Sequence, residues 1–392
     1  MEQYDVLIVG AATAGSYFAR KIAEAGHSVL VLEKLTKDSL GRRLDIFHVA
    51  KADFARFGLP LPERNDDLAF EFSGGRTFSA FDRYPKNTPA NVVGMHMHRY
   101  IARLNRWAQE AGATFVYGAA FTDFLFEDGR VAGVLYECDG ERHEAYAKLV
   151  VDCSGIPSVA RRTLPVGYGM ELFEITDTEK FYVTLRYVVY HDPADYIKST
   201  RGWTYYKTWE APEGDASCAI LGVGANFSYD EGERVFAAFE RAVKLPRYTV
   251  KHIERGTTPY RRPPYSFVAD GFLVSGDAAC LTKPSAGEGV TASMVQLEIA
   301  SEVVNELLDE GGYLTRARLW PINTRYIAAQ GKAFAGQLAT LIGAMSSTAA
   351  ENDFFFQHDV IFSDKTFAAL GKGDPLTFST GELLRMAAVM AG

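Results

Sequence analysis

The most informative stretch of the sequence reads Asp5-Val6-Leu7-Ile8-Val9-Gly10-Ala11-Ala12-Thr13-Ala14-Gly15. Its four consecutive apolar residues predict a fully buried strand, Gly10 predicts a tight turn, and a helix is expected over residues 13–26. Strand, glycine turn and helix in this order are typical of a dinucleotide-binding site, with Ala12 in place of the usual middle glycine of Gly-x-Gly-x-x-Gly. The amides and the dipole at the start of this helix would face the phosphates.

A second apolar strand follows at residues 28–32 and ends in Glu33. In dinucleotide-binding folds an acid at this place accepts hydrogen bonds from ribose hydroxyls. Glu33, rather than a small residue followed by Arg, favours an unphosphorylated ribose, as in FAD or NAD. Glycine turns also occur for packing alone, but strand, turn, helix, strand and acid in register together predict a dinucleotide site.

Length and composition limit the class of protein. At 392 residues the chain exceeds the usual size of a single core, so two interleaved domains or one large domain are expected. A net charge of −8 without a run of Lys and Arg argues against nucleic-acid binding. The four cysteines have no paired spacing, which indicates reduced thiols of a cytoplasmic protein rather than a disulfide or zinc framework. The 26 Phe and 20 Tyr suit a site lined with aromatic rings.

Neither a secretion signal nor a transmembrane segment is expected. The first strand begins directly at the N-terminus, which leaves no room for a signal peptide. No run of about 18 apolar residues occurs. The sequence leaves open whether the protein contacts a membrane surface peripherally.

The next part of the chain carries a basic pair, a β-rich insertion and two close histidines. Arg42 and Arg43 either reach the dinucleotide phosphates or lie in a solvated loop, and the sequence favours neither. Residues 68–95 predict short antiparallel strands inserted into the nucleotide domain. His96 and His98 would share one face of a strand, but without a third ligand nearby we expect no metal site.

Local patterns predict most of the remaining elements. A helix is expected from Arg99, and a meander over residues 121–136 turns at Asp128-Gly129. Residues 168–252 predict an antiparallel second domain, covered by a helix over 230–245. Within it the segment Trp203-Thr204-Tyr205-Tyr206 is interpreted as one strand with Trp203 and Tyr205 on the same face. The chain is predicted to be helical from residue 314 onward. Residues 334–345 are expected to be buried against the nucleotide-binding domain, and the alternatives are that they cap the substrate site or mediate an oligomer.

The third dinucleotide element lies at residues 271–290. A buried strand ends in Gly276-Asp277, where a carboxylate can accept a hydrogen bond from a ribityl hydroxyl. Gly287 and Gly289 then allow the amides at a helix N-terminus to face an electron-rich ring edge. The alternative is that Asp277 simply caps the next helix.

Together these elements resemble the flavoprotein superfamily of p-hydroxybenzoate hydroxylase type, and within it the geranylgeranyl reductase family. The match rests on the N-terminal fingerprint, on Arg99 at a helix start, on the turn at residues 152–155 and on the segment 276–289, and it covers residues 1 to about 310. The resemblance implies an α/β fold: a Rossmann-like FAD-binding domain, an interleaved antiparallel β-sheet substrate domain and a helical C-terminal tail. The expected division is 1–70, 96–165 and 266–312 for the FAD-binding domain, 71–95 and 166–265 for the substrate domain, and 313–392 for the tail.

The motifs and the resemblance together nominate the site residues. The expected FAD-binding residues are Gly10, Ala12, Thr13, Ala14, Gly15, Glu33, Lys34, Arg43, Arg99, Phe121, Gly276, Asp277, Gly287, Gly289 and Val290. Trp203, Tyr205 and Tyr206 are expected to bind substrate. His48, Tyr205 and Tyr206 are candidate proton donors, although a structural role is the simpler interpretation for each.

The expected function is reduction of a carbon–carbon double bond of a hydrophobic or aromatic substrate. Lipid-reducing relatives tend to carry a cysteine in the loop matched here by residues 41–48 and an aromatic-x-Trp-x-Phe-Pro segment where this chain has residues 203–207, so prenyl reduction is not implied. The Trp-x-Trp-x-Ile-Pro segment of flavin halogenases is also absent. The alternatives are an aromatic-ring monooxygenase and a non-catalytic flavin-binding protein. Since only one dinucleotide fingerprint occurs, an external electron donor, whether NAD(P)H, ferredoxin or another protein, must reach the flavin transiently.

Overall fold

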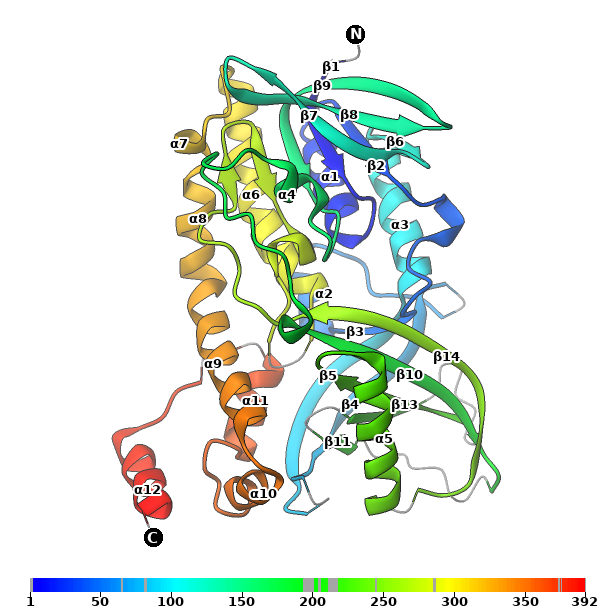
Figure 1. Ribbon diagram of the computed structural model, residues 1–392, viewed down its shortest axis with the longest axis vertical. Helices are drawn as coiled ribbons and strands as arrows, with labels where there is room; N and C mark the ends of the chain where they lie inside the picture. The colour runs from blue at the N-terminus through cyan, green and yellow to red at the C-terminus, as the bar shows by residue number, and fades with distance from the viewer. Residues whose placement is uncertain are drawn as a thin grey trace.

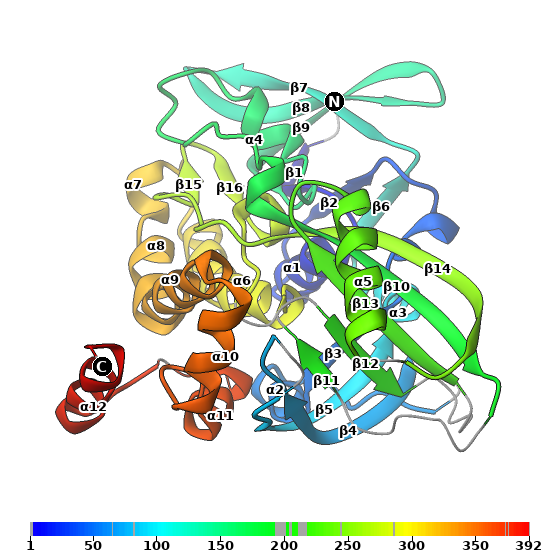
Figure 2. The same ribbon diagram turned by 60° about the horizontal axis from the view of Figure 1, so that its bottom comes forward.

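The computed structural model has two large β-sheets that lie one above the other along the long axis of the molecule (Figure 1). It describes residues 3–64, 66–80, 83–192, 201–203, 206–210, 218–243, 245–284, 287–372, 374 and 376–391. Each sheet contains eight strands. The turned view shows the same division, with the helices after the last strand grouped at one side (Figure 2).

The first sheet is the dinucleotide-binding sheet. Its main path runs β15-β16-β9-β1-β2-β6. The strands are β1 (Gln3–Val9), β2 (Val29–Glu33), β6 (Thr114–Tyr117), β9 (Glu141–Asp152), β15 (Val268–Ala269) and β16 (Phe272–Val274). Strand β1 is central and parallel to both neighbours, with Ile8 opposite Val31 on one side and Val151 on the other. Because β1 is covered on both faces, its apolar run is buried, as predicted.

Three helices bury this sheet. They are α1 (Thr13–Glu24), α3 (Met97–Glu110) and α6 (Val290–Glu310). The meander β7 (Ala120–Glu127) and β8 (Arg130–Cys138) joins the edge of β9, and its turn has positive φ at Asp128 and Gly129. The predicted helix starts near residues 13 and 99 and the predicted meander are therefore confirmed.

The second sheet has the order β14-β10-β13-β12-β11-β4-β5-β3. Its strands are β3 (Ile46–Ala50), β4 (Leu68–Thr77), β5 (Lys86–His96), β10 (Lys180–Tyr190), β11 (Arg201–Trp203), β12 (Tyr206–Glu210), β13 (Cys218–Ala225) and β14 (Tyr248–Pro259). Helix α5 (Tyr229–Val243), predicted at 230–245, covers one face, where Phe236 and Phe239 pack on Val188 and Leu221. All neighbours pair antiparallel except β11 with β4, which run parallel.

Two sequence-based assignments are wrong. Residues 46–50, placed in the FAD-binding domain, form β3 at the edge of the second sheet and pair with β5. Trp203 and Tyr206 do not lie in one strand, because β11 ends at Trp203, β12 begins at Tyr206, and the two strands pair antiparallel. In both cases a short apolar or alternating run has the same pattern whichever partner it takes, so the sequence does not reveal the pairing.

The C-terminal region is helical, as predicted. It contains α7 (Arg316–Leu319), α8 (Pro321–Tyr326), α9 (Lys332–Ser346), α10 (Ala349–Gln357), α11 (Asp364–Lys372) and α12 (Thr380–Ala391). The prediction that residues 334–345 are buried is only partly right, since Phe334 and Gln337 are buried while Ile342 is 51% exposed. None of the described helices combines the length and the apolar character needed to cross a membrane.

Candidate functional site

A cavity of about 400 Å³ lies where the two sheets meet. One wall comes from the turn after β1 and from the segment between β16 and α6. The opposite wall comes from β3, β10, β13 and β14, and Leu341 of α9 closes one side. A cavity of this size between two layers is typical of a small-molecule site.

The turn after β1 leaves no room for side chains at two glycines. A Cβ atom on Gly15 would lie 1.9 Å from the carbonyl oxygen of Gly10, and one on Gly10 would lie 2.4 Å from that of Cys153. Gly10 also has φ of +109°, which favours glycine. The close packing of α1 on β1 and β9 therefore requires both glycines.

Glu33 braces the same turn. Its side chain is buried, and one carboxylate oxygen accepts from the amide of Ala11 at 2.9 Å while the other accepts from Leu35 at 2.8 Å. The acid at the end of β2 is thus tied to the glycine turn at the end of β1. The carboxyl ends of the parallel strands β1 and β2 therefore lie side by side at this turn. Parallel sheets bind ligands at the carboxyl ends of their strands.

Two helices begin at the cavity without a capping side chain. Ala12 occupies the N-cap of α1 and Gly289 that of α6, and neither first turn contains an acid. The N–H groups of these first turns are therefore available to a ligand with negative charge. Residues of both helix starts line the cavity, namely Ala12, Thr13, Ala14, Gly289, Val290 and Thr291.

Asp277 lies between these helix starts and also lines the cavity. Its carboxylate accepts from the hydroxyl of Thr282 at 2.9 Å. Burial raises the pKa of Asp277, and the Thr282 hydrogen bond opposes that shift. Helix α6 begins only at Val290, so the alternative that Asp277 caps the next helix is wrong.

A cluster of three charged or ionisable side chains also lines the cavity. The Glu288 carboxylate lies 2.9 Å from Nε2 of His48 and 2.7 Å from Nζ of Lys283, and all three residues line the cavity. Burial alone would raise the pKa of Glu288, but the His48 hydrogen bond and the Lys283 charge outweigh it and lower the pKa. We call these three residues the Glu288 cluster.

The wall opposite the glycine turn is apolar. Alternate residues of β10, namely Phe181, Val183 and Leu185, line the cavity, while Val188 and Tyr190 pack toward α5. Ile46 and Phe47 of β3 extend this wall. The period of two along β10 therefore gives the second sheet one face that packs against α5 and one apolar face that lines the cavity.

Comparison with known proteins identifies the fold of this site. Residues 3–297 match a family model described as FAD binding domain. The chain belongs to this FAD-binding domain family. The predicted FAD cofactor is thereby confirmed, and the uncapped helix starts and glycine turn fit a pyrophosphate and an anionic ring edge.

Relatives of this FAD-binding domain include reductases. The chain is 25% identical over 323 residues to a digeranylgeranylglycerophospholipid reductase of Methanocella arvoryzae, covering 80% of this chain and 81% of that protein. This supports the resemblance to geranylgeranyl reductases.

Solved structures share the fold. A geranylgeranyl bacteriochlorophyll reductase-like protein of Thermoplasma acidophilum has a TM-score of 0.80 at 18% identity, covering 99% of this chain and 96% of that one. The p-nitrophenol 4-monooxygenase PnpA of Pseudomonas putida has a TM-score of 0.71 at 16% identity, covering 94% and 96%. The same architecture therefore occurs with different chemistries.

The structure brings many of the predicted FAD-binding residues to the cavity. Those lining it are Ala12, Thr13, Ala14, Gly276, Asp277, Gly287, Gly289 and Val290, and Gly10, Gly15 and Glu33 build the adjoining turn. Lys34, Arg43, Arg99 and Phe121 do not line it. Arg99 is exposed and donates to the carbonyl of Asp66 at 2.7 Å, and Phe121 packs on Phe124. These four assignments stay predictions.

The predicted substrate residues are not tested by the structure. Tyr205 lies outside the described residues, and for Trp203 and Tyr206 only the strand positions are described. The sequence analysis missed Lys283, Glu288 and the β10 residues of the apolar wall. Glu288 had a usable signal, since it stands between the two glycines of the ring-facing motif.

The expectation that no third metal ligand lies near His96 and His98 is wrong. The Asp45 carboxylate lies between their Nδ1 atoms. Asp45 comes from the loop before β3, far from the histidines in sequence, so spacing alone could not reveal it.

Proposed function

We propose that this protein is an FAD-dependent oxidoreductase that reduces a carbon–carbon double bond of a hydrophobic or aromatic substrate. The observation that carries the proposal is the cavity itself, which faces the FAD-binding turn on one side and an apolar wall on the other and contains the Glu288 cluster. An apolar wall binds an unsaturated hydrocarbon group by burial, and the Glu288 cluster offers an imidazole that can deliver a proton.

We assign the proton-donor role to His48. Its Nε2 faces the Glu288 carboxylate at 2.9 Å, which orients the imidazole ring in the cavity. Lys283 binds the second carboxylate oxygen, which holds the Glu288 side chain in place. Bound FAD, once reduced, supplies the hydride, and the protein supplies orientation, exclusion of water and the proton.

FAD is proposed to lie along the glycine turn. Glu33 would accept from the adenosine ribose, the α1 amides would face the pyrophosphate, and Asp277 would accept from the ribityl chain. The electron donor is proposed to be external. The described cysteines 138, 153 and 280 are free thiols, which supports a cytoplasmic location.

The competing function is ring hydroxylation. The fold shared with p-nitrophenol 4-monooxygenase favours it as the second candidate. The two functions differ in their use of oxygen, because a reductase transfers hydride to its substrate whereas a monooxygenase consumes oxygen.

An anaerobic assay separates them. The flavin is reduced chemically, unsaturated apolar compounds are added, and reoxidation is followed by flavin absorbance. We expect reoxidation with formation of the saturated product, and a large loss of rate in His48→Gln, on the order of a hundredfold or more, at unchanged FAD content. The monooxygenase function would replace the reductase function if two results occurred together. No unsaturated compound would reoxidise the flavin, and a hydroxylated product would form in the presence of oxygen and NAD(P)H.

A further inference from the structure

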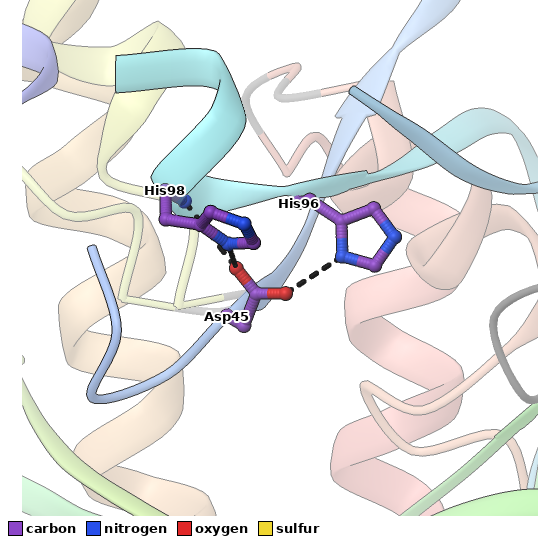
Figure 3. A group of neighbouring side chains, drawn as sticks. All are labelled: Asp45, His96 and His98. Carbon is purple, nitrogen blue, oxygen red and sulfur yellow. Dashed lines mark hydrogen bonds and ion pairs between the residues drawn. The ribbon is translucent and has the colours of Figure 1, made fainter. Parts of the chain in front are cut away.

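Three potential metal ligands converge just outside the cavity. Asp45 precedes β3, His96 ends β5, and His98 lies in the first turn of α3. Figure 3 shows the carboxylate between the two imidazole rings. The Oδ2 atom of Asp45 lies 2.6 Å from Nδ1 of His96, Oδ1 contacts Nδ1 of His98, and the three ligand atoms lie within 4.8 Å of one another.

The surroundings hold these side chains in place. The exposed fractions of the side chains are 17% for Asp45, 11% for His96 and 23% for His98. The backbone of Asp45 is fixed on both sides, since its amide donates to Glu254 at 2.9 Å and its carbonyl accepts from Met97 at 2.6 Å. The cluster is thus largely desolvated and mounted on fixed backbone.

We propose that Asp45, His96 and His98 bind a divalent transition-metal ion, for which zinc is the best match. Two imidazole nitrogens and one carboxylate oxygen are ligands that zinc prefers, and three protein ligands leave a fourth position for water. Tetrahedral zinc separates its ligand atoms by about 3.4 Å, given bonds of about 2.0–2.2 Å. The contacts of Asp45 with His96 and with His98 must therefore each open by roughly 1 Å. Each histidine would bind through Nδ1, with its proton on Nε2.

The position of the cluster indicates a bracing role. Leu44 and Ile46 flank Asp45 and line the cavity, and Met97 lines it between the two histidines, whereas the three ligands do not line it. The ion would therefore fix the loop before β3 to the start of α3, behind the cavity wall. It would not contact the substrate.

The test uses tag-free, FAD-loaded protein that has been stripped of metal with a chelator and dialysed. Calorimetric titration with zinc chloride should give one ion per chain. His96→Gln and His98→Gln should each weaken zinc binding by on the order of a hundredfold, while the exposed His191→Gln should not. FAD content and circular dichroism check that the variants fold. No zinc binding, or equal binding in all variants, would overturn the proposal.

A second measurement needs no variant. Crystals of the wild-type protein soaked in zinc chloride should give an anomalous peak between Asp45, His96 and His98. Zinc peaks only at other places would show that the cluster is a hydrogen-bonded group without a metal function.

Discussion

At the scale of single residues, two carbonyl oxygens limit what the dinucleotide turn can contain. The Gly10 oxygen faces Gly15, and the Cys153 oxygen faces Gly10. Both contacts are with backbone, so neither can be relieved by rotating a side chain. The glycine pattern could be predicted from the sequence, but the atoms that enforce it could not, since Cys153 directly follows β9, far along the chain.

Gly15→Val should abolish FAD binding, because its Cβ would lie 1.9 Å from the Gly10 oxygen and would push α1 away from β1. Flavin absorbance per chain measures the loss. Gly336→Ala is the matched control, since a Cβ there meets nothing within 4 Å. FAD at full occupancy in Gly15→Val would contradict the argument.

Glu33→Ala should weaken FAD affinity by about tenfold to a hundredfold, which corresponds to about 1.5–3 kcal/mol for a hydrogen bond to a charged group. Part of the effect would come from the turn, because Glu33 also binds the amide of Ala11. Fluorescence titration of flavin-free protein with FAD measures it. The exposed Glu137→Ala on β8 serves as control, and equal affinities in the two variants would show that Glu33 only ends a strand.

Glu288 should make stability depend on pH. Its pKa is lower in the folded protein than the usual 4.5, so its ionised form stabilises the fold above that pH and the benefit is lost as the pH falls through the lower, folded value. Glu288→Gln should therefore be less stable than wild type at pH 7, with a difference that shrinks below about pH 4.5. Urea unfolding at pH 7 and pH 4 measures this, and a difference that grows on acidification would contradict it.

At the scale of elements, local sequence patterns predict the helices and turns correctly, but they do not predict which strands pair with each other. Helix α5 and the Asp128-Gly129 turn follow from the period of apolar residues and from glycine, which act within a few residues. The partner of β3 is β5, which follows about forty residues later, and nothing local encodes that choice. The cavity wall depends on it, because Ile46 reaches the cavity only when β3 joins the second sheet.

Helix α9 offers an element-scale test of the cavity. Leu341 lines it, whereas its neighbour Ile342 is 51% exposed. Leu341→Trp should overfill the cavity and raise the KM for the reducible substrate by about tenfold, since overpacking costs about 1–3 kcal/mol. Ile342→Trp should leave KM unchanged. Equal values for the two variants would show that α9 does not border the substrate.

At the scale of the whole molecule, the two sheets are joined where the chain crosses between them. One crossing covers residues 164–179 and the return covers residues 260–267. Glu171 of the first crossing binds Arg262 of the second through two hydrogen bonds of 2.8 and 3.0 Å, and Glu179 pairs with Arg261 at 2.6 Å. These contacts tie the two crossings to each other.

Arg161 is the buried centre of this junction. Its guanidinium donates to the carbonyls of Ala278, Glu171 and Phe173 and stacks on the Phe173 ring, so it links the FAD-binding loop to the first crossing. Arg161→Met would remove the side-chain donor from the half-buried carbonyls of Glu171 and Phe173, at about 1–3 kcal/mol each. Ala278 would keep its bond from the Ser158 hydroxyl.

We therefore expect Arg161→Met to lower the free energy of unfolding by about 3–5 kcal/mol, as removal of a buried cation from its partners does. The adjacent Arg162→Met is the control. Arg162 is exposed and lies 3.4 Å from Glu174, and a surface pair of this kind contributes about 0–1 kcal/mol. Urea unfolding followed by circular dichroism measures both. If the two variants lose the same stability, the hydrogen bonds of Arg161 do not hold the FAD-binding loop against the first crossing, and the junction depends on the other pairs between the crossings.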